Sequence, residues 1–243
     1  MMIIILLIIG HMIADFFLQS SNMEENKQNN IKALLAHSCI YLLVFVVIDF
    51  TFIQPLIAIW VTLILFITHI IIDFIIIKID NRVVNKQVRI STFIIDQILH
   101  LSTIIVLYYC FDLALKVNTV YSNFESYSNF KEILMYCLLF VVLLDPAAVF
   151  IKKLNAFLFK EEIDSNYGNN AGSTIGKLER IITAILLLCD QYNVIGLVLT
   201  AKSIARFRQL EEKDFAEKYL IGTLLSLSIS LILTIAVKYV LSL

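Results

Sequence analysis

The sequence predicts an all-α fold, a polytopic transmembrane helix bundle with six spans and either a re-entrant hairpin or a seventh span. Three observations support this. Of the 243 residues, 60% are hydrophobic and 16% are charged, and the mean hydropathy is +0.87, more than a soluble domain of this size can bury. Long apolar runs recur along the chain. Two prolines and six glycines favour long unbroken helices over a barrel.

The apolar runs give the order of the expected spans. Runs long enough to cross a bilayer lie at 2–18, 32–53, 56–79, 91–115, 132–151 and 216–241. The first lacks a basic n-region and a small-residue cleavage site, so we expect a retained span rather than a signal peptide. Because no repeat or soluble domain is evident, we expect 1–243 to be a single integral membrane domain. It would consist of a four-helix half (1–115) and a C-terminal half (132–243).

The segment 181–201, IITAILLLCDQYNVIGLVLTA, fits either a seventh span or a re-entrant hairpin. A hairpin tip close to the bundle centre would carry Asp190, Gln191 and Asn193. Cytoplasmic loops are richer in Lys and Arg than outer loops, and the hairpin segregates these residues better. Of the 19 basic residues, it leaves outside only Lys116, Lys131 and Lys238. In both topologies the basic loop DNRVVNKQVR faces the cytoplasm.

Polar side chains recur within the first four spans. Each of the four histidines lies in a different span, and three have an aspartate four residues away. The residues are His11 with Asp15, His37 alone, His69 with Asp73, and Asp96 with His100. The i,i+4 spacing puts both members of a pair on one helix face.

The seven side chains are expected at one depth. The depth of each side chain below the inner end of its span follows from a helical rise of about 1.5 Å per residue. The aspartates lie at a depth of roughly 6–9 Å and the histidines at roughly 8–15 Å. The order is His-then-Asp in the descending first and third spans and Asp-then-His in the ascending fourth, as one shared layer requires. Left unpaired in hydrocarbon, such groups cost about 2–3 kcal/mol each.

A cation shared by this layer would offset that cost. We predict that all seven residues bind one or two divalent transition-metal ions, Zn²⁺ first, with Mn²⁺ or Fe as alternatives. The aspartates could instead orient the histidines from outside the ligand shell. The competing interpretation is that interhelical hydrogen bonds staple the bundle without any metal.

Several motifs resemble a known family. HMIADFFLQ, a later Lys with LLAHS, THIIID and DQILH are similar to those of an uncharacterised bacterial integral-membrane family, domain of unknown function 3307. IGKLER, QYNVIGLVLTAKSIARF and EKYLIGTLLS resemble it as well. That family is more loosely similar to membrane-bound metal-dependent hydrolases with phospholipase-C-like motifs. The resemblance implies a multi-pass protein of the bacterial cytoplasmic (inner) membrane.

The C-terminal half offers a second set of charged residues. Lys202 and Arg206 begin an amphipathic helix expected near 202–215. Its cations would lie among anionic headgroups, or Lys202 and Arg206 would bind the phosphate of a substrate at the metal site. Asp49 and Asp112 lie near the outer ends of their spans, and we expect both to be solvated.

Three functions remain open. The first is a metal-dependent hydrolase acting on a lipid-borne phosphoester from the cytoplasmic leaflet, with Asp15, Asp73 or Asp96 as general base. The second is a divalent-cation transporter, which the apolar outer halves of the spans disfavour. The third is a non-catalytic membrane protein with a structural metal. We expect membrane lipid as a partner and no nucleic acid.

Overall fold

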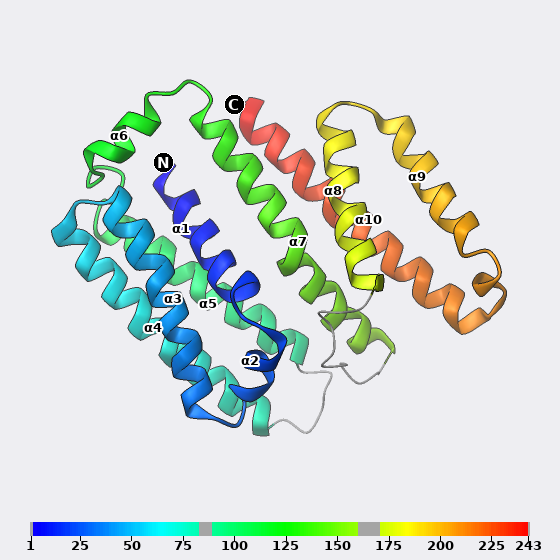
Figure 1. Ribbon diagram of the computed structural model, residues 1–243, viewed down its shortest axis with the longest axis horizontal. Coiled ribbons are helices and arrows are strands. Elements are labelled where there is room, and N and C mark those ends of the chain that lie inside the picture. Colours follow the sequence, from blue (N-terminus) through cyan, green and yellow to red (C-terminus); the bar gives the residue numbers. More distant parts are fainter. Residues whose placement is uncertain (1, 83–88, 160–170, 243) are drawn as a thin grey trace. The chain divides into compact units, whose positions relative to one another are not determined.

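The computed structural model describes residues 2–82, 89–159 and 171–242, and this part of the chain is helical, without a β-sheet. The all-α prediction is confirmed. The predicted loops at 80–89 and 152–173 lie partly outside the described residues. The helices (Figure 1) are α1 (Ile3–Met12), α2 (Ser21–Asn26), α3 (Ile31–Phe52), α4 (Pro55–Arg82), α5 (Arg89–Cys110), α6 (Thr119–Glu125), α7 (Phe130–Phe159), α8 (Ala171–Leu188), α9 (Tyr192–Ala205) and α10 (Lys213–Ser242).

Five of these helices, α3, α4, α5, α7 and α10, are long and apolar enough to cross a membrane, and Ile3–Phe17 is a shorter apolar helix. Their outward faces carry large apolar side chains such as Leu43, Trp60 and Val106. An apolar exterior of this kind is suited to lipid rather than water. The length and apolar composition of these helices therefore indicate a multi-pass membrane protein. The predicted spans overlap the observed helices, although α7 and α10 continue further into their charged ends and α5 ends at Cys110 rather than at 115.

The described part of the chain divides into two compact units, the first with residues 2–82 and 89–141 and the second with residues 142–159 and 171–242. In the first unit, α1 contacts α3 and α5, α3 contacts α4, and α4 contacts α5, so the four helices close a ring. Apolar side chains such as Leu7, Phe45 and Ile104 fill its centre. Gly10 allows α1 to approach α3 closely, because a Cβ there would meet the Ile48 side chain.

Two short helices that the sequence did not predict lie at opposite ends of this ring (Figure 1). At one end α2 begins after Ser20, whose hydroxyl accepts a hydrogen bond from the Met23 amide. At the other end α6 begins after Asn118, whose side chain accepts one from the Tyr121 amide. Side-chain caps of this kind stabilise a helix start by satisfying free backbone amides. They make helices of segments that look like loops by composition.

Asp49 is buried, which corrects the expectation that it is solvated. Its carboxylate lies between α3 and α4 and accepts a hydrogen bond from the Thr62 hydroxyl at 2.6 Å. The ring covers it because Asp49 lies on the same face of α3 as Tyr41 and Phe45, at intervals of four residues. Asp112 is exposed as expected, in a turn with a φ of 48°.

In the second unit, a buried arginine binds α7 where Pro146 interrupts its hydrogen bonding. Proline has no N–H and disturbs the preceding turn of a helix. From α8, the Arg180 guanidinium donates to the carbonyls of Leu143 and Leu144 at 2.6 and 3.0 Å. It also lies 3.4 Å from the Ser226 hydroxyl of α10. Arg180 thus links three helices of this unit.

The segment 181–201 forms a hairpin of two helices, α8 and α9, rather than one continuous span. Its tip is exposed instead of central, which corrects the sequence interpretation. Asp190, with a φ of 57°, accepts hydrogen bonds from Lys238 of α10 at 2.5 Å and from Tyr192 at 2.7 Å. These bonds hold the pKa of the Asp190 carboxyl below its usual range. Residues 202–215 are not one helix, because α9 ends at Ala205 and a 3₁₀ turn precedes α10.

Candidate metal centre

The His and Asp side chains of the first unit meet inside the ring of α1, α3, α4 and α5. After α1, residues Ile13–Phe17 form one π-helical turn that contains Asp15. Such turns are rare in proteins, and many of those that occur lie at functional sites. His37 comes from α3, His69 and Asp73 from α4, and Asp96 and His100 from α5. The structure thus brings together the layer that the helical spacing predicts.

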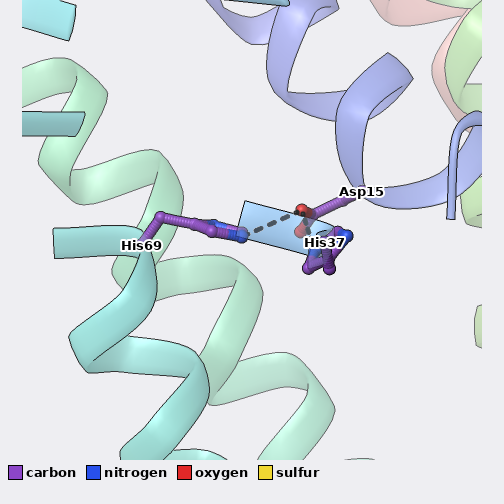
Figure 2. A group of neighbouring side chains, drawn as sticks. All are labelled: Asp15, His37 and His69. Carbon is purple, nitrogen blue, oxygen red and sulfur yellow. Dashed lines mark ion pairs between the residues drawn. The ribbon is translucent and has the colours of Figure 1, made fainter. Parts of the chain in front are cut away.

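Asp15 lies between histidines from two other helices. Figure 2 shows the rings of His37 and His69 directed at its carboxylate. His37 Nε2 lies 3.4 Å and His69 Nε2 lies 3.9 Å from Asp15 Oδ1. All three side chains are more than nine-tenths buried. A carboxylate between two imidazoles, with little access to water, is a strong candidate for sharing a cation.

A second set of contacts centres on His100. Its Nε2 lies 3.4 Å from Asp73 Oδ1 and 3.3 Å from Asp96 Oδ1. Asp73 Oδ2 lies 3.8 Å from His37 and 3.9 Å from His69. Asp73 of α4 therefore connects the two sets of contacts.

These separations discriminate between the two interpretations of the layer. Hydrogen bonds between nitrogen and oxygen are about 2.7–3.2 Å long, shorter than these His–Asp distances of 3.3–3.9 Å. Ligand atoms bound at about 2.0–2.2 Å to a tetrahedral ion are about 3.3–3.6 Å apart. The spacing therefore fits ligands around a cation better than a hydrogen-bonded staple.

Unsatisfied polar atoms support the same fit. Both ring nitrogens of His37 and of His69, together with Asp15 Oδ1, Asp96 Oδ1 and His100 Nε2, are buried without a hydrogen-bond partner in the described part of the chain. Buried polar groups in proteins nearly always have partners. Nitrogen and carboxylate donors directed at one another are the set that Zn²⁺ binds, so the residues fit a divalent transition metal.

Three groups of residues in the described part have ligand atoms within 4.8 Å of one another. They are Asp15 with His37 and His69, His69 with Asp73 and His100, and Asp15 with Asp96 and His100. The first and third share only Asp15, so this carboxylate can bridge two ions through its two oxygens. The geometry accommodates one ion or two. The roles of individual residues as ligands or catalytic groups stay predictions.

His11 differs from the other three histidines. It belongs to none of these groups among the described residues. Its Nε2 lies 3.3 Å from the Gln97 side-chain oxygen and 3.8 Å from Asp15 Oδ2. Gln97 also donates to Asp96 at 3.1 Å. His11 and Gln97 therefore connect the two carboxylates from outside the groups, as orienting residues do.

Sequence reasoning missed two further neighbours of the layer. The ring of Tyr41 stacks on His69, with centroids 3.8 Å apart and planes at 10°. Lys27, which follows α2, donates to Asp73 Oδ2 at 3.1 Å and to Gln19 at 3.0 Å. The i,i+4 relation of Tyr41 to His37 was a usable signal. The pattern that resembles the family contains a Lys between HMIADFFLQ and LLAHS, but the contact of Lys27 with Asp73 depends on the fold of a loop.

Lys27 is charged in this environment. Burial acts to lower the pKa of its ammonium, but the carboxylates of Asp73, Asp15 and Asp96 outweigh that effect and raise it. Access to the layer increases toward this lysine. The histidine side chains are at most 2% exposed, whereas Asp96 is 16% and Lys27 is 17% exposed. The layer therefore opens beside Lys27 and Asp96.

Comparison with protein families gives one result. The model of DUF3307, described as a protein of unknown function, matches residues 3–129. This is just over half of the 243 residues and contains every His and Asp of the layer. The chain belongs to the DUF3307 family. No curated protein and no solved structure matches it.

Within this DUF3307 protein, the matched residues extend from α1 to α6. The resemblance of the distal motifs, from IGKLER onward, lies outside the match and stays an expectation. Lys202 donates to Glu179 at 2.6 Å and to Thr223 at 3.1 Å, and Arg206 lies near the rings of Phe215 and Tyr219. The predicted binding of phosphate by Lys202 and Arg206 stays a prediction.

Proposed function

We propose that this DUF3307 protein is a membrane-embedded, metal-dependent hydrolase of the bacterial cytoplasmic membrane, acting on a lipid-borne phosphoester. The observation that carries the proposal is the spacing of the buried His and Asp atoms, 3.3–3.9 Å apart without hydrogen bonds between them. This spacing suits ligands of a divalent ion. Three carboxylates in one site leave one available for proton transfer.

Asp96 is the best placed of these carboxylates to act as general base. It is the most exposed of the three, and Gln97 orients it through a hydrogen bond to Oδ2. Asp15 lies between two histidines, and Asp73 is bound by Lys27. A bound divalent ion would polarise the phosphoryl group and lower the pKa of an attacking water. Asp96 would then accept the proton of that water.

The position of the exposed edge supports entry from the cytoplasmic leaflet. Lys27 belongs to the loop after the first span, which the distribution of basic residues assigns to the cytoplasmic side. On the opposite side of the layer, Phe45, Leu65 and Leu7 are buried in the apolar core. A lipid headgroup would therefore reach the layer from the side of α2.

Hydrolysis of defined lipids tests this function. Protein purified in detergent would be loaded with Zn²⁺ or Mn²⁺, reconstituted with phosphatidate and phosphatidylglycerol, and assayed by mass spectrometry of the lipids. We expect cleavage that chelator abolishes. Asp96→Asn should lower the rate at least 100-fold, while Asp112→Asn, an exposed aspartate, should not. If the metal-loaded protein cleaves neither lipid, the proposed hydrolase activity is contradicted. The interpretation that remains is a membrane protein with a structural metal.

One observation favours the alternative of a divalent-cation transporter. Asp49 and Thr62 form a buried polar pair between α3 and α4, beyond the layer. A transporter needs a second polar position of this kind along its path. Uptake of Zn²⁺ or Mn²⁺ into proteoliposomes, lost in Asp49→Asn, would favour transport over hydrolysis.

A further inference from the structure

Lys27 is held against the layer by several contacts of one short segment. Its ammonium binds Asp73 at 3.1 Å and Gln19 at 3.0 Å. The segment itself is fixed to the end of α4, because the Asn81 side chain donates to the carbonyl of Gln28 at 2.9 Å. An ammonium at the layer is thus a built feature of the fold rather than a flexible surface charge.

The two oxygens of Asp73 have different neighbours. Oδ2 accepts the hydrogen bond from Lys27, whereas Oδ1 faces His100 Nε2 at 3.4 Å. Asp73 can therefore use Oδ1 as a ligand without releasing Lys27. On this geometry Asp73 can bind Lys27 through one oxygen and an ion through the other.

Charge balance gives Lys27 a purpose. Ligand histidines are neutral, so the layer contributes the negative charges of Asp15, Asp73 and Asp96. A single divalent ion leaves one of these charges uncompensated, and a phosphate would be repelled. Lys27 offsets that remaining charge. With the lysine, a site holding one ion is neutral and a site holding two is positive, as an anionic substrate requires.

The ammonium also has hydrogen-bonding capacity. A lysine has three N–H donors, and in the described part of the chain the hydrogen bonds of Lys27 go to Gln19 and Asp73. A further donor lies at the exposed edge of the layer, where substrate would enter. Lysine binds phosphate as a point charge and needs no particular orientation of the group.

We propose that Lys27 is a substrate-binding residue that donates a hydrogen bond to a phosphoryl oxygen of the ligand while Asp73 holds the metal. The proposal rests on the proposed function, because it takes the layer to be a metal site. It defines the ligand as a phosphate monoester or diester, whether of a lipid headgroup or of a soluble molecule. It also separates phosphate binding at Lys27 from metal binding by the His and Asp side chains.

Calorimetry of the metal-loaded protein in detergent tests the proposal, with inorganic phosphate and dihexanoyl phosphatidate as probes. Lys27→Met is expected to keep the wild-type metal content and to bind both probes about 10- to 100-fold more weakly. Lys27→Arg should recover part of the affinity. Lys32→Met, which removes an exposed lysine at the start of α3, is the matched control and should bind as the wild type does.

Each contrary outcome has its own meaning. Equal affinity of wild type and Lys27→Met for both probes would overturn the role of Lys27 and leave the metal site intact. Loss of metal in Lys27→Met would also overturn the role of Lys27 in binding phosphate, since the lysine would then be required for metal binding. A wild-type protein that binds no metal would overturn the proposed function itself. Tighter binding of dihexanoyl phosphatidate than of phosphate identifies a lipid ligand, and equal binding a soluble one.

Discussion

His37 Nε2 lies 3.4 Å from Asp15 Oδ1, and neither atom has a hydrogen-bond partner in the described part of the chain. Asp15 comes from the π-helical turn after α1 and His37 from α3, and these two elements are in contact. Two buried polar atoms placed this close without bonding are costly unless they share a third partner. A divalent cation is the partner that both atom types bind.

Histidines 11 and 37 should differ in their effect on metal binding. His37 belongs to a group with ligand spacing, whereas His11 faces Gln97. We expect His37→Gln to lose at least one equivalent of metal. His11→Gln should keep the wild-type stoichiometry with an affinity weakened about 10- to 100-fold, as for residues that orient ligands. Competition with a chromogenic chelator measures both. Equal loss of metal in the two variants would contradict the assignment.

Tyr41 should stabilise the layer by packing. Its ring is buried and stacked on His69. Tyr41→Ala removes a large aromatic side chain from the core, so we expect a loss of about 3–5 kcal/mol in unfolding free energy. Denaturation in detergent, followed by tryptophan fluorescence and circular dichroism, measures the loss. Tyr109→Ala, at an exposed position of α5, is the control, and a similar loss there would remove the argument for stacking.

Asp49 should tolerate loss of its charge better than loss of its oxygen. A buried carboxylate with a single hydroxyl partner is costly to bury as an ion. Asp49→Asn keeps an acceptor for Thr62 and is expected to leave stability unchanged or raised. Asp49→Ala leaves the Thr62 hydroxyl unpaired and should cost about 1–3 kcal/mol. Thermal unfolding compares the two, and greater damage from Asp49→Asn would show that the charge is required.

Arg180 should be required by the second unit and not by the metal layer. Its guanidinium binds two carbonyls near Pro146, and a lysine cannot reproduce that planar arrangement. We expect Arg180→Lys to lower the unfolding free energy by about 1–3 kcal/mol while metal content stays unchanged. Arg208→Lys, at an exposed site, is the matched control. Unchanged stability in Arg180→Lys would refute its role in holding α7.

The sequence predicted those features that depend on local spacing. The apolar runs located the spans, and the i,i+4 pairs with their reversed order, together with His37, located the layer of His and Asp side chains. Features that depend on long-range packing were not predictable in this way. Lys27 reaches Asp73 across 46 residues, and Asp49 is buried because the ring closes over one face of α3. The hairpin tip is held by Lys238, 48 residues from Asp190.

Elemental mass spectrometry of the protein purified without chelator, and offered Zn²⁺, Mn²⁺ and Fe²⁺, tests the central claim most directly. We predict one or two equivalents of a transition metal in the wild type. At least one equivalent should be lost in His69→Ala and in Asp73→Asn, and none in the control Asp112→Asn. A folded wild-type protein without metal under all three conditions would contradict the account. The layer of His and Asp side chains would then be a structural contact between helices.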